Sequence, residues 1–382
     1  MARVPEITDL RAGLDHCASR PHRAVLALVR AAAGRQVDES LVSDLEASDP
    51  EDIVRIATFT YVHVVLAEGL TRAPDLARVV PRDLIVYFEE MQRANLRRNT
   101  LLRNQLRVVG AALDDAGIRG VALKGGAELL APVFSVQAFR FLSDLDILVP
   151  EGDIGPAIIA LRQIGAHSDD VDEINVRDHH HVAPLTHDGW PVQVELHRAL
   201  AQGAGSTILE PDKVLQMARP SGLRGLFVPT HVDRLTHSVL HAQFSPQRYR
   251  DGLLSLRDIL ELDVLFQELS KDEIAAAKAR FRTKSARDAW EALDASRALV
   301  LGDPEEVEAL SPRARLWAER AVAGFGRPGR RRASTLLGWA GWYVKEALLN
   351  PERRAHYVKK MRRPGALSRA LAHHRENWRR TR

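Results

Sequence analysis

The sequence predicts an α+β protein in which a small mixed sheet lies between helical regions on both sides. Residues before 119 carry apolar side chains at helical spacing, as in the stretch Pro50–Arg72. Short apolar runs of strand length follow at 121–123 and 139–149, and Asp188-Gly189 is a hairpin signal between two further extended runs. From about residue 206 the helical spacing returns. These observations place one α/β core in the middle of the chain.

The same patterns divide the chain into four expected regions. These are an N-terminal helical region (1–118), an α/β core (119–205), a C-terminal helical domain (206–325) and a basic, tryptophan-containing helical tail (326–382). In the first region, residues 81–116 predict one long helix with a single internal glycine, Gly110, and an end at Gly117. In the core, Asp153–Ile164 predicts an amphipathic helix.

Composition limits the class of protein. The chain has 382 residues, of which 45% are apolar and 27% charged, which is typical of a soluble globular protein with two or three domains. The single cysteine, Cys17, excludes an internal disulfide framework and a thiolate zinc cluster. We find no apolar signal segment at the N-terminus and no apolar run of the roughly 20 residues that span a bilayer. We therefore expect a cytoplasmic protein without a membrane span.

Charge is distributed unevenly along the chain. From Arg327 onward there are 16 Lys and Arg against 3 Asp and Glu, which leaves 38 basic and 47 acidic side chains before it. A basic tail on an acidic body is suited to a polyanion such as nucleic acid, or to an acidic partner. The alternative is a solvated tail whose tryptophans pack on the body.

The stretch Val121–Val149 carries the main functional signal. It begins with a short strand and the turn Lys124-Gly125-Gly126, from which a helix continues at Ala127–Leu130, and it ends on a strand with Asp144 and Asp146. Alternate side chains of a strand share a face, so the two carboxylates point the same way and repel each other by about 4 kcal/mol near a protein surface. A divalent cation between them removes this cost, and oxygen ligands suit Mg²⁺. The alternative is a strand end with two solvated acids.

A third carboxylate follows on the strand after Asp188-Gly189. There Gln193, Glu195 and His197 share one face, and the alternating valines and Leu196 share the other. Three carboxylates can hold two Mg²⁺ ions, and backbone N–H groups at a glycine turn that opens a helix can bind phosphates. This combination is the layout of nucleotidyl transfer, with Glu195 next to the attacking hydroxyl as metal ligand or base.

The motifs L-K-G-G, R-F-L-S-D-L-D-I-L-V and V-E-L-H together resemble the uncharacterised nucleotidyltransferase family of the polymerase-beta-like superfamily. The resemblance covers roughly residues 85–265 and implies a mixed-sheet nucleotidyltransferase core, a nucleoside triphosphate substrate and Mg²⁺. It assigns catalysis and metal binding to Asp144, Asp146 and Glu195. The nucleotide-binding residues that it and the chemistry suggest are Lys124, Gly125, Gly126, Arg140, His197, Arg257 and Asp258.

Several of these residues have an alternative, structural interpretation. Lys124 is either a phosphate contact or a solvated lysine, and Arg140 either clamps phosphate or pairs with Asp144. His197 either orients Glu195 or is a satisfied histidine at a strand end. For Arg257 and Asp258 the choice lies between contacts to base or ribose and an ordinary pair on a helix surface.

The run His179-His180-His181 is a weak candidate for zinc, because successive residues on a strand point to opposite faces and at most two of them cooperate.

Three functions remain open from the sequence. The first is Mg²⁺-dependent transfer of a nucleoside monophosphate from an NTP to a hydroxyl or phosphate of a small molecule, sugar or peptide, with release of pyrophosphate. The second is modification of tRNA or another RNA, including a toxin-like role, through the basic tail. The third is an inactive nucleotide-binding scaffold.

Overall fold

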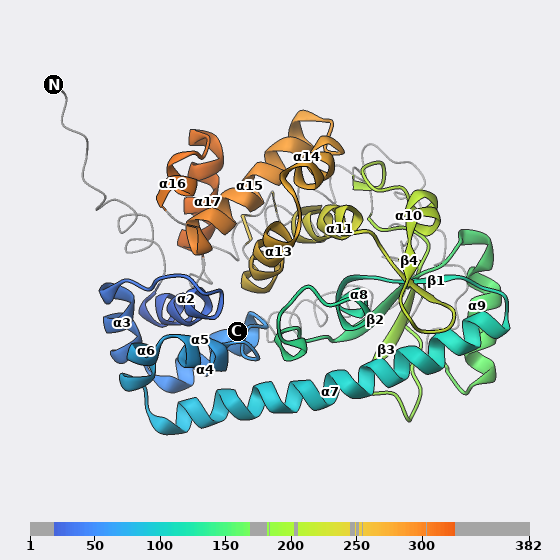
Figure 1. Ribbon diagram of the computed structural model, residues 1–382, viewed down its shortest axis with the longest axis horizontal. Coiled ribbons are helices and arrows are strands. Elements are labelled where there is room, and N and C mark those ends of the chain that lie inside the picture. Colours follow the sequence, from blue (N-terminus) through green and yellow to red (C-terminus); the bar gives the residue numbers. More distant parts are fainter. Residues whose placement is uncertain are drawn as a thin grey trace, which may run out of the picture.

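The structure is a computed structural model that describes residues 19–168, 182, 184–201, 205–244, 249, 252, 253, 255–302 and 304–324 (Figure 1). Its N-terminal helices are α2 (Arg20–Ala32), α3 (Glu39–Glu46), α4 (Pro50–Phe59), α5 (Leu66–Arg72), α6 (Pro74–Arg78) and α7 (Arg82–Asp115). The strands are β1 (Gly120–Ala122), β2 (Asp144–Leu148), β3 (Gln193–His197), β4 (Arg219–Pro220) and β5 (Leu226–Val228). Between them lie α8 (Lys124–Leu130), the 3₁₀ turns η1 (Gln137–Phe139) and η2 (Glu151–Asp153), α9 (Ile154–Gln163) and α10 (Pro211–Met217). The later helices are α11 (His231–Phe244), α13 (Leu256–Glu268), α14 (Lys271–Ala279), α15 (Lys284–Leu301), α16 (Pro304–Glu308) and α17 (Pro312–Gly324).

The α+β prediction is confirmed, and the predicted long helix is α7. Its 34 residues extend about 50 Å at the usual rise per residue, and Gly117 follows it with a φ of +71°. In Figure 1, α7 runs along the molecule from the group of N-terminal helices to the sheet. This helix therefore connects the two ends of the fold.

The sheet is mixed and has the strand order β3-β2-β1-β5-β4. The β2–β3 and β1–β5 pairs are parallel, whereas β1–β2 and β4–β5 are antiparallel. The predicted hairpin at Asp188-Gly189 is present, because Leu185 exchanges backbone hydrogen bonds with Val194 on β3. Strand β2 is second in this order and has a neighbouring strand on each side.

Strand alternation separates the two faces of the sheet. Leu145 and Ile147 pack with the apolar side chains of α7 and α9, whereas Leu148 packs with those of α10 and α11. Asp144 and Asp146 alternate with the former pair and so lie on the α11 face. Leu145 and Ile147 are both fully buried.

The prediction of purely helical structure from residue 206 is wrong at 219–228. These residues form β4 and β5, so the sheet extends beyond the expected core range of 119–205. The two strands have two and three residues, too few to show an alternating pattern in the sequence. The turn before β5 packs directly on α7: a Cβ on Gly110 would lie 2.5 Å from the carbonyl oxygen of Arg224, so glycine is needed in this helix.

Buried amide side chains of α7 hold the connection between α8 and β2. The Asn95 side chain donates to the carbonyls of Ala138 and Arg140 at 2.7 and 3.0 Å. The Asn99 side chain donates to those of Gln137 and Arg140 at 2.7 and 3.0 Å. The backbone carbonyl groups of this connection, which form no regular strand or helix ladder, thereby receive hydrogen bonds from side chains of α7.

No helix among the described residues is long and apolar enough to cross a membrane. Cys17, the run His179-His180-His181 and the basic tail at 326–382 lie outside the described residues.

Helix α8 is fixed to α11 by a buried ion pair. Glu128 accepts a hydrogen bond from Arg234 Nη2 at 2.7 Å and also from the backbone N–H groups of Val133 and Phe134. Arg234 Nη1 donates to the carbonyl of Ala131 at 2.6 Å. Both ionic side chains are at least 94% buried, and their hydrogen bonds satisfy the charges that burial removes from water.

We expect Glu128→Ala to lower the free energy of unfolding by about 3 kcal/mol, because it leaves the Arg234 guanidinium buried without its counter-ion. Urea denaturation followed by circular dichroism measures the change. Arg224→Ala, which removes an exposed pair with Asp114 and Asp115, is the control and should have little effect. Equal stability losses in the two variants would contradict the assigned role of the buried pair.

Candidate functional site

Three neighbouring elements bring ionisable side chains to one face of the sheet. The parallel register pairs Asp144 with Gln193, Asp146 with Glu195 and Leu148 with His197. Helix α8 begins directly after β1, and its first residue, Lys124, reaches the same place. The expected meeting of Asp146 with Glu195 on adjacent strands is therefore present in the fold.

Asp146 is the centre of this group and is only 2% exposed. Its Oδ1 atom accepts from Lys124 Nζ at 2.8 Å and contacts His197 Nε2 at 2.7 Å. Burial by itself raises the pKa of this carboxyl, but Lys124 and His197 together outweigh burial and hold the pKa below its usual range. Because both contacts fall on Oδ1, the second carboxylate oxygen, Oδ2, is the one available to a cation.

Asp144, two residues earlier, has the opposite electrostatic character. Burial and then the charge of Asp146 raise its pKa, against smaller opposing effects of Lys124, Ser143 and Arg257. The two carboxylates on one strand face thus differ: Asp146 is neutralised by fixed partners, whereas the charged form of Asp144 is disfavoured.

Glu195 and His197 complete a compact group with Asp146. One ligand atom from each of the three lies within 4.8 Å of the other two, a spacing at which one metal ion can be shared. Glu195 accepts from Gln193 Nε2 at 3.2 Å, and its Oε2 lies 3.8 Å from His197 Nε2. Two carboxylates and an imidazole fit a divalent cation, and oxygen ligands of this kind suit Mg²⁺. Asp144, which was expected from the sequence to be a metal ligand, is not in this group. His197, which was expected to bind the nucleotide, is in it.

The predicted glycine turn is the first turn of α8, because the helix begins at Lys124 and not at Ala127. Lys124 has a φ of +46°, a left-handed conformation that is unusual for a residue with a side chain. A Cβ on Gly125 would lie 2.5 Å from Leu142 Cγ, whereas one on Gly126 would make only ordinary contacts. Packing against Leu142 therefore accounts for Gly125.

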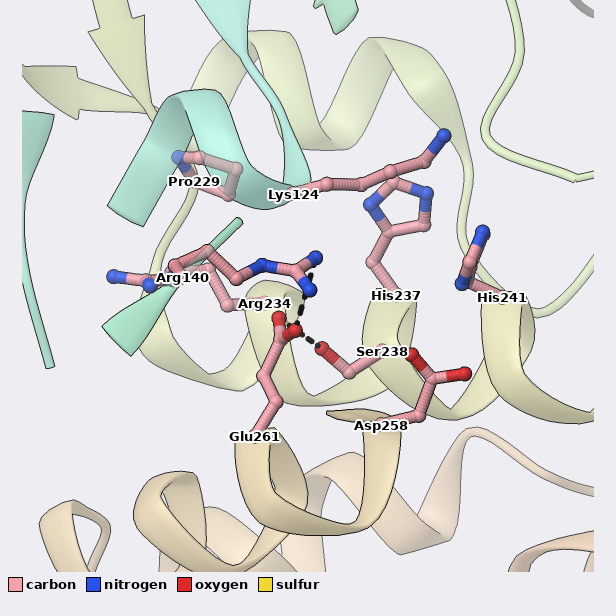
Figure 2. A pocket seen from close by; sticks show the side chains of 9 residues that line it. All are labelled: Lys124, Arg140, Pro229, Arg234, His237, Ser238, His241, Asp258 and Glu261. Atoms are coloured by element: carbon pink, nitrogen blue, oxygen red, sulfur yellow. Dashed lines mark hydrogen bonds and ion pairs between the residues drawn. The ribbon is translucent and has the colours of Figure 1, made fainter. Parts of the chain in front are cut away.

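A narrow pocket of about 20 Å³ opens beside Lys124 (Figure 2). Helices α11 and α13 supply most of its lining, and the full set is Lys124, Arg140, Pro229, Arg234, His237, Ser238, His241, Asp258 and Glu261. No motif in the sequence identified His237, Ser238 and Glu261 as site residues. The one available signal is the spacing of His237 and His241, which places both on one face of a helix. Burial, followed by Lys124 and His241, lowers the pKa of His237 well below its usual value, so this imidazole is neutral.

Arg140 extends into this pocket and is 93% buried. Its Nη2 pairs with Glu261 at 3.1 Å, as Figure 2 shows. The alternative of an ion pair with Asp144 is therefore wrong, because the partner is Glu261. The reason is that Glu261 comes from α13, more than a hundred residues away, and strand spacing gives no information about it. Nε and Nη1 of Arg140 are buried without a hydrogen-bond partner in the described part of the chain.

Arg257 and Asp258 lie beside the same pocket. Arg257 Nε donates to Asp258 Oδ1 at 3.3 Å, and their side chains are 19% and 6% exposed, so the alternative of an ordinary surface pair is wrong. Asp258 lines the pocket, and the Arg257 guanidinium lies over the Tyr61 ring at 5.2 Å. Their positions keep both residues within the candidate site.

Comparison with known proteins identifies the family of this chain. A family model described as an uncharacterised nucleotidyltransferase matches residues 46–294, well over half of the chain. The chain belongs to this nucleotidyltransferase family. The match confirms the resemblance in the sequence and extends on both sides of 85–265. No curated protein matches the sequence at a significant level.

The two aspartates of the nucleotidyltransferase should respond oppositely to loss of charge. Asp146→Asn removes a buried carboxylate from Lys124 and His197 and should lower the free energy of unfolding by about 3 kcal/mol. Asp144→Asn replaces a carboxyl whose raised pKa means that its charge costs stability at neutral pH, so this variant should be more stable than the wild type. Thermal unfolding at pH 7 in a chelator measures both. Destabilisation by both variants would contradict the assignment.

Proposed function

We propose that this nucleotidyltransferase moves a nucleoside monophosphate from an NTP to a hydroxyl or phosphate group of a small-molecule, sugar or peptide acceptor, with Mg²⁺ as cofactor. The observation that carries the proposal is the group of buried Asp146, partly buried Glu195 and buried His197 next to Lys124. Family membership supports the reaction type. The donor set fits a divalent cation, since two of its three members are carboxylates.

Asp144, Asp146 and Glu195 would hold two Mg²⁺ ions, which when bound neutralise phosphate charge and activate the attacking oxygen. His197 fixes the orientation of Asp146 through its 2.7 Å contact. The remaining chemistry is positioning and charge complementarity, which account for most of the catalysis of phosphoryl-type transfer.

The mouth of the pocket beside Lys124 is the proposed contact for the triphosphate of the NTP. Lys124 and Arg140 supply positive charge to the triphosphate, and the unpartnered Nε and Nη1 of Arg140 are suitable donors for its oxygens. Lys124 begins the first turn of α8, which also contains Gly125 and Gly126. In this proposal Arg257 and Asp258 face the ribose or the base.

In the transfer step, the acceptor oxygen forms a bond to the α-phosphorus and the bond from that phosphorus to the bridging oxygen of pyrophosphate breaks. The leaving pyrophosphate takes the electron pair of the broken bond. The proton of an attacking hydroxyl passes to the carboxylate of Glu195, which lies beside Asp146 in the strand register.

We expect Asp146→Ala, Asp144→Ala and Glu195→Gln each to reduce Mg²⁺-dependent pyrophosphate release at least a hundredfold, because each removes a negative charge that holds the cation. Incubation with mixed NTPs, Mg²⁺ and an extract of small metabolites, followed by mass spectrometry, measures release and identifies the product. Asp75→Ala, at an exposed site on α6, is the matched control and should retain full activity. Turnover at the wild-type rate in any of the three site variants would refute the proposal.

A further inference from the structure

A second, wider hollow adjoins the carboxylates, and none of the described residues lines both it and the pocket of Figure 2. We call it the aromatic groove. It has a volume of about 490 Å³ and is lined by Arg98, Phe141, Ser143, Thr186, His187, Trp190, Pro191, Val192 and Gln193. Its size is that of a site for one small molecule.

The aromatic groove reaches the candidate catalytic residues at two points. The side chain of Ser143 hydrogen-bonds to Asp144, and that of Gln193 donates to Glu195 at 3.2 Å. The segment before β2 forms a common wall: Arg140 is extended and lines the pocket, and the next residue, Phe141, lines the groove. A molecule in the groove is therefore next to the carboxylates and separated by one stretch of chain from the proposed NTP site.

The walls of the groove are suited to a flat, apolar group. The rings of His187 and Trp190 lie 5.3 Å apart at an angle of 33°. The guanidinium of Arg98 lies over the Phe141 ring, 4.7 Å from its centroid. Aromatic and guanidinium planes of this kind stack on planar rings of ligands.

The charge of the groove is suited to an anion. Among the described residues that line it, Arg98 is the single Arg or Lys and none is an Asp or Glu. Nη1 of Arg98 is buried and has no hydrogen-bond partner among the residues that the structure describes. A buried guanidinium N–H without an acceptor is costly, and a ligand oxygen would satisfy it.

We propose that the aromatic groove binds the acceptor, and that this acceptor is a small molecule with a planar ring, one anionic group and the hydroxyl that is modified. The inference rests on the proposed function and adds the chemical class of the second substrate. Trp190 contacts the ring and Arg98 binds the anionic group. One cation among the described lining residues favours one anionic group over an RNA strand, which requires a series of cations along its backbone.

The test uses 1-naphthyl phosphate as a probe, titrated into the full-length protein by isothermal calorimetry. We expect measurable binding that weakens at least tenfold in Arg98→Gln and in Trp190→Ala. Arg97→Gln, an exposed neighbour on α7, is the matched control and should bind as the wild type does. Inorganic phosphate and 1-naphthol, which each lack one half of the probe, should bind at least tenfold more weakly than the probe. Absence of probe binding to the wild type, or equal weakening by Arg97→Gln and Arg98→Gln, would overturn the proposal.

Two further measurements separate this inference from the proposed function. Binding of a non-hydrolysable NTP analogue with Mg²⁺ should be unchanged in Arg98→Gln and Trp190→Ala, which also shows that both variants are folded. If the probe fails but the analogue binds and Asp146→Ala loses pyrophosphate release, the groove assignment alone is wrong. Displacement of the probe by single-stranded RNA, with a steep dependence on salt, would contradict a small-molecule acceptor and indicate an RNA end in its place.

Discussion

The arrangement of the site depends on one buried carboxylate, that of Asp146. A carboxylate at 2% exposure is stable only if nearby charges and hydrogen bonds replace its hydration, and here Lys124 and His197 do so from two different elements. This requirement explains the start of α8: its first residue must reach Asp146, and Lys124 does so with a left-handed backbone that costs about 1 kcal/mol. Strand β3 must likewise pair with β2 in the one register that brings His197 to the same oxygen.

Helix α7 gives this arrangement its rigidity. The loop from α8 to β2 carries side chains to two different hollows, Arg140 to one and Phe141 to the other, and a mobile loop would not keep them apart. Asn95 and Asn99 each donate two hydrogen bonds to its backbone carbonyl groups. Because these amides are on a helix that also packs under the sheet, one helix contacts both the loop and the sheet that carries the carboxylates.

The sequence alone was sufficient for the features that depend on local pattern. The alternation in β2 placed Asp144 and Asp146 on one face, and the absence of breakers predicted α7. Features that depend on distant chain segments were not predictable. The partner of Arg140 is Glu261 on α13, and β5 is a three-residue strand whose place in the sheet is set by β1. The start of α8 was also missed, because a Gly-Gly pair is typical of a turn and the packing of Gly125 on Leu142 is visible only in the fold.

The difference between the two aspartates indicates where a cation would gain most. The charge of Asp146 is already balanced by Lys124 and His197, so a further cation gains less from it. Asp144 has a raised pKa because burial and Asp146 oppose its charge, and a cation bound there would relieve both effects. The side chain of Ser143, which lines the aromatic groove, also contacts Asp144. The carboxylate that a cation would stabilise most thus lies next to the groove that we propose for the acceptor.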